Sequence, residues 1–526
     1  MMKMKNKTIL LLFIFCCLSV FSQNTASKKK IRSLLKEAQY YFDNDEYFSS
    51  WQSYRQVLAI DDKNELAGVN GVICMSKLNY PVDSMIPLST NLSMSGLPDA
   101  KYYLAKIKHQ KHAFDEALRL LDAYLKIPFR QRLHNDVETN YLIGMCINAR
   151  EFIKNPHRSV IKNIGKEINS PFADYVPVIM PDESELYFTS KREGSSNNKK
   201  NGDNTFFEDV YVSSKIDGAW TNAVNIAEPV NSETNDGCVA LSPDGQRMIV
   251  FRTSVDKLSG DLYITQIGPN NKWEPLQLMN EKINSPYIET SACFSTDTSE
   301  IYFSSDRPGG MGGKDLYRIK KLPNGQWSAP MNLGPGVNTI YDEDSPFMHP
   351  DGITLYYSSK GHNTMGDYDV FRSTWNSGTN LFSQAENLGY PINDVNCDIF
   401  FVLSVDGQRG YYSSVKDETF GGVDIYQVDT RFGDNELKAE EGFAFIDDKP
   451  CKAKITLTDK ETNAVTGVFY SNAYSGKFIL IFNPLKTYKV EVEAGECNPI
   501  VTEMTNLPPD MSSHYLNFKL KKNNAQ

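Results

Sequence analysis

The chain has 526 residues and is acidic, with 55 Lys and Arg against 65 Asp and Glu and a formal net charge of −10 at pH 7. This balance excludes nucleic acid as an expected partner, because nucleic-acid binding relies on a basic surface. The length predicts several domains, each large enough to bury its own core.

The N-terminus is predicted to be a secretory signal peptide over residues 1–22. Three lysines precede an apolar run over 9–20, which is shorter than the roughly 20 residues of a membrane-spanning helix. A lipid anchor at Cys16 or Cys17 is the alternative, but lipoprotein signals place a small residue before the modified cysteine, and Phe15 precedes Cys16 here. The mature chain is therefore expected to be exported, without a transmembrane segment.

Seven cysteines follow the predicted signal peptide, and no two of them are close in sequence: Cys74, Cys146, Cys238, Cys293, Cys397, Cys451 and Cys497. The odd number and wide spacing indicate neither a zinc site nor a dense disulfide framework. Cys451 and Cys497 form the pair considered for a disulfide, since both fall in the last domain. Buried free thiols are the favoured interpretation.

Residues 23–155 are predicted to form a domain of paired helices. Apolar residues recur at helical spacing over 31–42, 48–58, 102–107 and 113–125, without strand-like alternation. The pattern resembles tetratricopeptide repeats. The aromatic residues of these stretches are interpreted as the core between helices, with a concave peptide-binding face as the alternative.

Residues 156–437 carry five copies of a motif with a period of about 54 residues. In each copy a turn of the Pro-Asp-Gly type precedes a strand similar to Leu-Tyr-Phe-Ser-Ser. The turn aspartates are Asp182, Asp244, Asp297, Asp351 and Asp406. A loop and a further strand follow, and that strand begins with Asp, an aliphatic and an aromatic residue. Two strands joined by the turn and a third after the loop outline a propeller blade.

A fourth, outer strand is marked by an aromatic residue, then an asparagine or, in one blade, Gln277, and then a second asparagine. The asparagine pair also occurs before the first blade, at Asn163 and Asn169, and does not follow the last blade. We therefore predict that the strand near 160–165 completes the blade that contains Asp424 and Tyr426. This closure removes exposed sheet edges and sets the number of blades at five.

Residues 438–526 are predicted to form a small β-sandwich, because strand-like patterning resumes there after a charged linker. The predicted fold class is therefore multidomain. It combines all-α repeats of the tetratricopeptide type, a five-bladed β-propeller and a small β-sandwich.

The repeated Pro-Asp-Gly, Tyr-Phe-Ser-Ser and Asp-Leu-Tyr units resemble the WD40-like repeats of TolB-type periplasmic propellers. The last domain, with Ser475-Gly-Lys-Phe478 and Pro484, is similar to carboxypeptidase-regulatory-like modules. The order of these parts resembles envelope proteins of Bacteroidota, including the PorE-type component of the type IX secretion and gliding machinery. Such proteins commonly continue into an OmpA-like domain that binds peptidoglycan, which is not expected here.

This resemblance implies a non-enzymatic periplasmic scaffold in an assembly associated with the outer membrane. Its partners would be envelope proteins, including an outer-membrane β-barrel of the secretion machinery. A TolB-like adaptor and a glycan-binding periplasmic propeller are the alternatives. No enzymatic activity, cofactor or metal is expected, since the sequence has neither a Gly-x-Ser-x-Gly elbow nor a His-Glu-x-x-His motif. Glycosidase chemistry needs only two carboxylates and leaves no such motif.

Two sets of acidic residues recur once per blade. The first lies eight residues before each turn aspartate: Asp174, Asp236, Glu289, Glu343 and Asp398. We expect these acids to ring one mouth of the axial channel and to receive a Lys- or Arg-bearing segment of a partner. Capping of the turns between blades through backbone hydrogen bonds is the alternative.

The second set begins the third strand of each blade: Asp209, Asp261, Asp315, Asp369 and Asp424. Each of these aspartates is expected to accept hydrogen bonds from backbone N–H groups of the neighbouring loop. A divalent cation held in that loop is the alternative.

Overall fold

The structure of the chain is a computed structural model that describes residues 27–78, 80, 82–196, 198–200, 205–254, 259–430, 437–505 and 516–523. It divides into two compact units, Met1–Arg150 and Glu151–Gln526. The predicted signal peptide over residues 1–22 lies outside the described residues. Within the described ranges, every helix is too short or too polar to cross a membrane.

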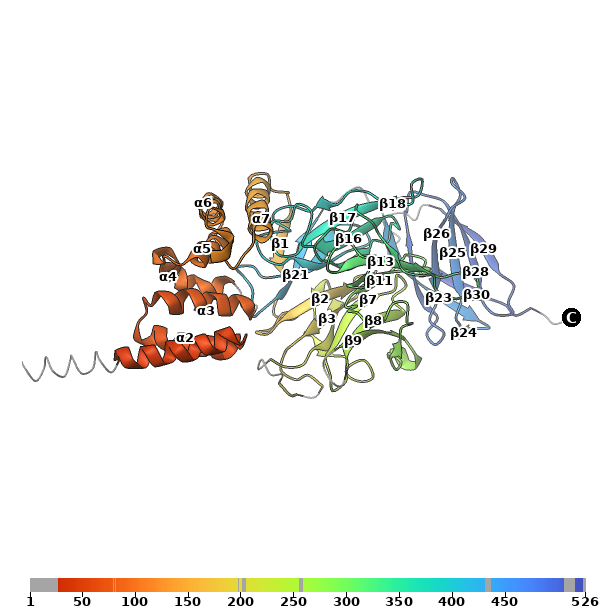
Figure 1. Ribbon diagram of the computed structural model, residues 1–526. Helices are drawn as coiled ribbons and strands as arrows, with labels where there is room; N and C mark the ends of the chain where they lie inside the picture. Colours follow the sequence, from red (N-terminus) through yellow and green to blue (C-terminus); the bar gives the residue numbers. More distant parts are fainter. Residues whose placement is uncertain are drawn as a thin grey trace, which may run out of the picture. The chain divides into compact units, whose positions relative to one another are not determined.

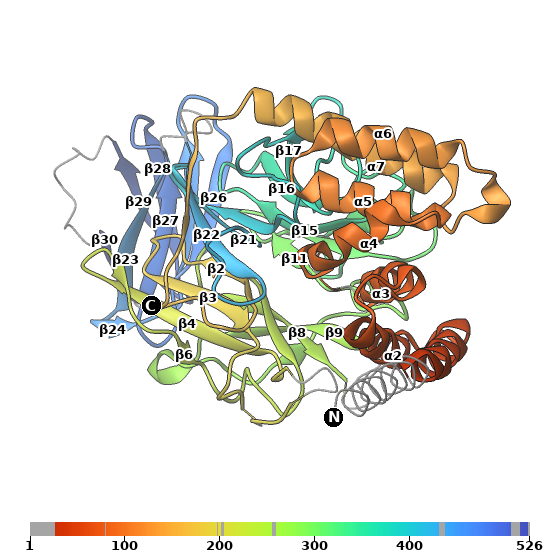
Figure 2. The same ribbon diagram turned by 90° about the vertical axis from the view of Figure 1, so that its left-hand side faces the viewer.

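The first unit is helical. Its described elements are a helix over 27–43, α2 (Tyr47–Ile60), α3 (Glu65–Lys77), η1 (Val82–Leu88), α4 (Ser89–Met94), α5 (Pro98–Gln110), α6 (Phe114–Leu125), η2 (Phe129–Gln131) and α7 (Asp136–Lys154). Helices α2 and α3 lie side by side, as do α5 and α6 (Figure 2). Tyr54, Tyr103 and Tyr124 are fully buried between them.

The predicted tetratricopeptide-type domain is corrected by this arrangement. Such repeats need two α-helices of similar length at a fixed interval, whereas the segment between α3 and α5 holds a seven-residue 3-10 helix and a six-residue α-helix. Pro87 lies inside η1 and lacks the N–H that an α-helix would use there. The unit is an irregular set of helices rather than a repeat array.

In the second unit, the described residues from 160 to 429 form five sheets of four or five short strands (Figure 1). With the strands of each sheet given from the axis outwards, the first contains β2 (Asp174–Ile179), β3 (Glu185–Ser190) and β4 (Asp209–Ile216) with β5 (Ala219–Trp220) and β6 (Val224–Asn225), and the second contains β7 (Asp236–Leu241), β8 (Arg247–Thr253), β9 (Gly260–Gln266) and β10 (Gln277–Leu278). The third contains β11 (Ala292–Phe294), β12 (Glu300–Ser305), β13 (Asp315–Lys320) and β14 (Met331–Asn332), and the fourth contains β15 (Glu343–Met348), β16 (Thr354–Ser359) and β17 (Asp369–Asn376) with β18 (Leu381–Phe382) and β19 (Glu386–Asn387). The fifth contains β20 (Ile399–Leu403), β21 (Arg409–Ser414), β22 (Asp424–Asp429) and β1 (Val160–Asn163). Each of the inner strands β2, β7, β11, β15 and β20 contacts the next, and β20 contacts β2, so the sheets form a closed five-bladed propeller.

The ring is closed by β1, which comes before the first blade in sequence. It pairs antiparallel with β22, from Val160 opposite Asp429 to Asn163 opposite Tyr426. The predicted pairing of this strand with the blade of Asp424 is thereby confirmed. The outer edge of the last blade is covered by a strand from the other end of the propeller sequence.

The repeated asparagines explain how each blade is held. The second asparagine of each pair accepts a hydrogen bond from one backbone N–H of the third strand and donates to the C=O of the same residue. The pairs are Asn169 with Ile425, Asn231 with Val210, Asn284 with Leu262, Asn338 with Leu316 and Asn393 with Val370. A side-chain amide thus replaces a strand neighbour and satisfies buried backbone groups.

The last part of the chain is a sandwich of two sheets. One contains β23 (Lys438–Ile446), β24 (Lys449–Pro450), β27 (Lys477–Phe482) and β30 (Leu516–Leu520), and the other contains β25 (Lys454–Asp459), β26 (Val465–Tyr470), β28 (Tyr488–Glu493) and β29 (Ile500–Met504). It packs against the propeller within the second unit. Ile479 is buried in one cluster with Val178 and Met180 of the first blade, and Val405 of the fifth blade is buried in the core of the sandwich. All seven described cysteines, including Cys451 and Cys497, are free thiols.

We predict that Asn169→Ala lowers the free energy of unfolding by about 1–3 kcal/mol, because the buried backbone N–H of Ile425 then has no partner, while its C=O keeps the N–H of Ile164. Chemical denaturation of the purified protein measures the change. Lys166→Ala, three residues earlier and exposed, is the control and should stay close to wild type. Equal stability of both variants would show that the side-chain bridge does not hold the ring closed.

Candidate functional site

The first set of predicted acids lies where the inner strands begin. Asp174, Asp236 and Glu343 are the first residues of β2, β7 and β15, while Glu289 and Asp398 come shortly before β11 and β20. All five are buried. Each accepts a hydrogen bond from the backbone N–H four residues earlier, as Asp174 does from Ser170 and Glu343 from Thr339. The turn before each inner strand is therefore capped by its own acid.

Four of these five carboxylates form ion pairs with basic side chains. Asp174 pairs with Arg192, Asp236 with Arg252, Glu289 with Arg307 and Asp398 with Lys416, at distances between 2.5 and 3.3 Å. The arginines also donate to backbone carbonyls of the preceding turn. Each ion pair thus ties the end of the second strand to the turn between blades.

The fourth blade lacks this cation. Gly361 stands where the first, third and fifth blades have Arg or Lys, and a Cβ there would lie 2.1 Å from Thr339 Oγ1. The neighbouring His362 Nε2 lies 2.8 Å from the carbonyl oxygen of Val337, which replaces the arginine contact to the turn. Among the described residues, the Glu343 carboxylate has hydroxyl and backbone partners, and burial raises its pKa to about 7.

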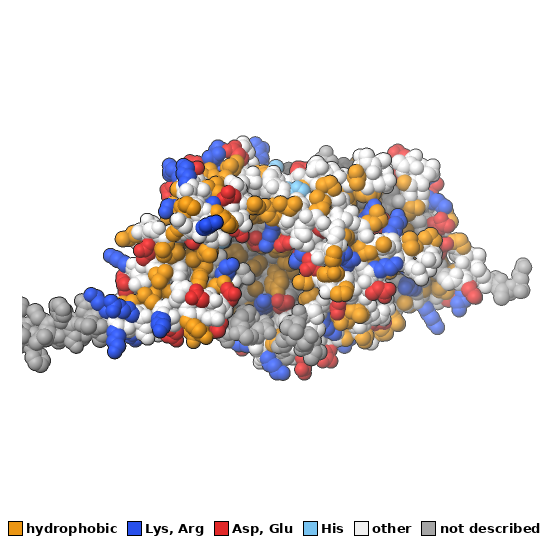
Figure 3. All heavy atoms as spheres, viewed as in Figure 1, with side chains coloured by type: hydrophobic (Ala, Val, Ile, Leu, Met, Phe, Trp, Pro, Cys, Tyr) orange, Lys and Arg blue, Asp and Glu red, His pale blue; other side chains and the backbone are white. Residues whose placement is uncertain are grey.

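The structure therefore brings the five acids to equivalent positions, with their hydrogen bonds inside their own blades. On the face drawn in Figure 3, acidic and basic side chains are interspersed rather than gathered by sign. Binding of a partner's basic segment by Asp174, Asp236, Glu289, Glu343 and Asp398 stays a prediction.

The second set of acids behaves as expected in four blades. Asp209, Asp315, Asp369 and Asp424 each accept a backbone N–H from the preceding loop. Burial raises the pKa of Asp369 to about 8, and this effect outweighs the opposing hydrogen bonds donated by the amide of Asn387 and two backbone N–H groups. A cation in these loops stays a prediction.

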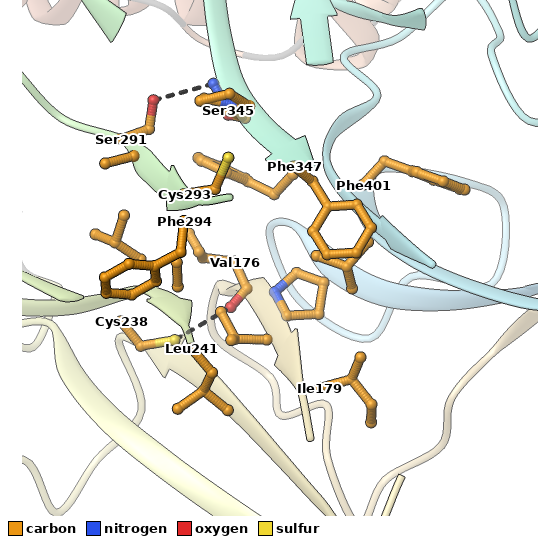
Figure 4. Close-up of a pocket in the computed structure, with 18 of the residues that line it drawn as sticks. Val176, Ile179, Cys238, Leu241, Ser291, Cys293, Phe294, Ser345, Phe347 and Phe401 are labelled. Atoms are coloured by element: carbon orange, nitrogen blue, oxygen red, sulfur yellow. Dashed lines mark hydrogen bonds between the residues drawn. The ribbon is translucent and has the colours of Figure 1, made fainter. Parts of the chain in front are cut away.

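A cavity of about 270 Å³ runs along the propeller axis and is lined by all five inner strands. Its lining is predominantly apolar, with Val176, Cys238, Cys293, Phe347 and Phe401 each contributed by a different strand. Figure 4 shows Val176, Cys238, Cys293 and Phe347 around one space, with the ring of Phe401 directed away from it and Ser291 and Ser345 together at one side. Sequence reasoning did not identify this cavity.

The inner strands are distorted where they line the cavity. Strands β2, β7, β15 and β20 shift register against their neighbours near their third residue. At this level Val176, Ser345 and Phe400 have φ angles of 53°, 55° and 62°, in the left-handed region that non-glycine residues rarely adopt. Bulges and left-handed residues concentrate at functional sites because they redirect side chains.

Polar groups lie at the end of the cavity where the inner strands begin. Tyr175 and Glu208 line it, and burial together with a hydrogen bond to Glu208 raises the pKa of Tyr175. Thr290 and Ser291 line another part, next to the ion pair of Lys314 with Asp344 at 2.6 Å. Ser345 Oγ is buried and has no hydrogen-bond partner among the described residues.

The sandwich covers the other end. Met180 and Val405 line the cavity where β2 and β20 have ended, and both belong to clusters that include buried sandwich residues. Within the second unit, the cavity is therefore apolar and covered at one end, and polar at the other.

Neither a family model nor a curated protein matches the chain. Partial likeness is found to solved glycoside hydrolases. The alpha-L-arabinofuranosidase of Podospora anserina, crystallised with cellotriose, is 11% identical over 51% of this chain and 92% of its own, with a TM-score of 0.33. The enzyme of the same name from Lactobacillus brevis is 12% identical over 50% and 92%, with a TM-score of 0.32. A putative glycosidase from Bacteroides thetaiotaomicron is 13% identical over 50% and 88%, with a TM-score of 0.33.

These findings correct four expectations from the sequence. The resemblance to PorE-type envelope proteins and to carboxypeptidase-regulatory-like modules is not upheld, because no family model matches. The scaffold role in secretion or gliding, which depended on that resemblance, is withdrawn with it. The expectation that the chain is not an enzyme is also withdrawn, because the two carboxylates of a glycosidase leave no sequence motif by which such an enzyme could be excluded.

We predict that the fourth blade makes stability depend on pH near neutrality. The pKa of Glu343 in the folded protein is about 7, above its ordinary value of 4.5. The protonated carboxyl therefore contributes to the free energy of unfolding in full below about pH 4.5, and this contribution is lost as the pH rises through 7. The unfolding free energy of the wild type should decrease between pH 5 and pH 8. In Glu343→Gln this decrease should be smaller by about 1–3 kcal/mol. Denaturant titrations at the two pH values measure it, with the exposed Glu496→Gln as control. An unchanged pH dependence in Glu343→Gln would contradict the assignment.

Proposed function

We propose that the propeller binds a carbohydrate-containing ligand in its axial cavity. The observation that carries this proposal is the combination of an aromatic, apolar lining with the polar side chains of Tyr175, Glu208, Thr290 and Ser291 at one end. Sugar rings present C–H faces that pack on aromatic side chains and hydroxyl groups that need hydrogen-bond partners. Ligand sites commonly combine an apolar lining with a few placed polar groups in this way.

Two features support this choice. The rings of Tyr175 and Phe400 lie 6.3 Å apart and belong to neighbouring inner strands. Glu208 and Thr290 supply oxygen atoms at the same end of the cavity.

The proposed location is the periplasm, in association with the outer membrane, on the basis of the predicted signal peptide. Envelope proteins as partners belong to the same proposal. Cell fractionation with an antibody against the chain tests the location, and recovery in the cytoplasmic fraction would contradict it.

Calorimetric titration of the purified protein with a panel of soluble oligosaccharides, beginning with cellotriose, tests the ligand class. We expect Phe400→Ala to weaken binding about tenfold or more, because it removes one aromatic ring from the polar end. Tyr474→Ala, which removes an exposed ring of the sandwich, is the matched control. The release of reducing ends in the same mixtures measures hydrolysis. Absence of binding and of hydrolysis across the panel would contradict the proposal.

A further inference from the structure

The inner, apolar part of the axial cavity does not suit a free sugar. Below the polar end, its lining consists of side chains such as Val176, Ile179, Leu241, Cys293 and Phe347. A sugar hydroxyl placed there would lose its hydrogen bonds to water without gaining others, which is unfavourable. An apolar group in the same place would gain from leaving water.

The volume of the cavity also exceeds what one small apolar group needs. A dry cavity of about 150 Å³ lined by aliphatic and aromatic residues accommodates benzene, whereas this one measures about 270 Å³. The space holds an aromatic ring or short acyl chain and leaves room beside it for part of a polar group.

The two ends of the cavity set the direction of such a ligand. The sandwich covers the end at Met180 and Val405, so an apolar group would lie against that end. The opposite end carries Glu208, which pairs with Lys191 at 3.3 Å, and Thr290 beside the pair of Lys314 and Asp344.

From this geometry we infer that the ligand is a saccharide that carries an apolar substituent, an aryl or short acyl group. The substituent occupies the apolar depth and the sugar occupies the polar end. The inference rests on the proposed function, because it assigns a substrate class to the same cavity.

Matched glycosides test it directly. Methyl and phenyl glycosides of glucose, galactose and arabinose are titrated calorimetrically into the full chain, together with phenol. We expect a phenyl glycoside to bind at least tenfold more tightly than the methyl glycoside of the same sugar, and more tightly than phenol. Leu241→Trp, which fills the apolar part of the cavity, should abolish the advantage of the phenyl glycoside over the methyl glycoside. Ile179→Trp is the second filling variant, and the wild-type comparison decides the question if neither variant folds.

The outcomes separate the two proposals. Equal binding of methyl and phenyl glycosides overturns the inference and leaves carbohydrate binding intact. Binding of phenol as tight as that of every phenyl glycoside shows that no sugar is recognised, and it overturns both. Absence of binding by all glycosides also overturns both. A phenyl advantage that persists in folded Leu241→Trp and Ile179→Trp places the substituent elsewhere and overturns the inference.

Discussion

The closure of the ring by β1 is the constraint on which the second unit depends. The inner strands line the cavity only because each blade is flanked by two others, and that requires the fifth blade to meet the first. The pairing of β1 with β22 and the bridge from Asn169 to Ile425 complete the fifth blade. An open ring would leave a sheet edge exposed and the axial wall incomplete.

Much of the propeller could be predicted because its structural requirements repeat. Every blade needs a tight turn, an acid that caps the turn before its own inner strand, and an asparagine that bonds backbone groups of the third strand. These residues therefore recur at the blade period. The position of Asn163 and Asn169 before the first blade was enough to predict the closure. The helical unit was harder, because amphipathic spacing predicts helices without predicting their lengths, and Pro87 shortens one of them.

The candidate site could not be predicted from the same pattern. The residues that line the cavity at equivalent positions are Val176, Cys238, Ser291, Ser345 and Phe400, which share no chemistry. The acids that recur in every blade proved to cap turns. Repetition therefore marked what every blade needs to fold, whereas the cavity is built from positions at which the blades differ. The left-handed conformation of Val176 and Phe400, residue types with no preference for it, left no sequence signal.

The closure also sets an order of folding. Asn163 and its partner Asp424 are 261 residues apart in the chain, and a ribosome produces the chain from its N-terminus. Strand β1 must therefore stay unpaired while four complete blades and most of the fifth are synthesised. Contacts between such distant segments form late and slowly, and an unpaired strand is prone to wrong partners in the meantime. Because β1 closes the finished ring, the first strand of the propeller to be synthesised is the last to pair.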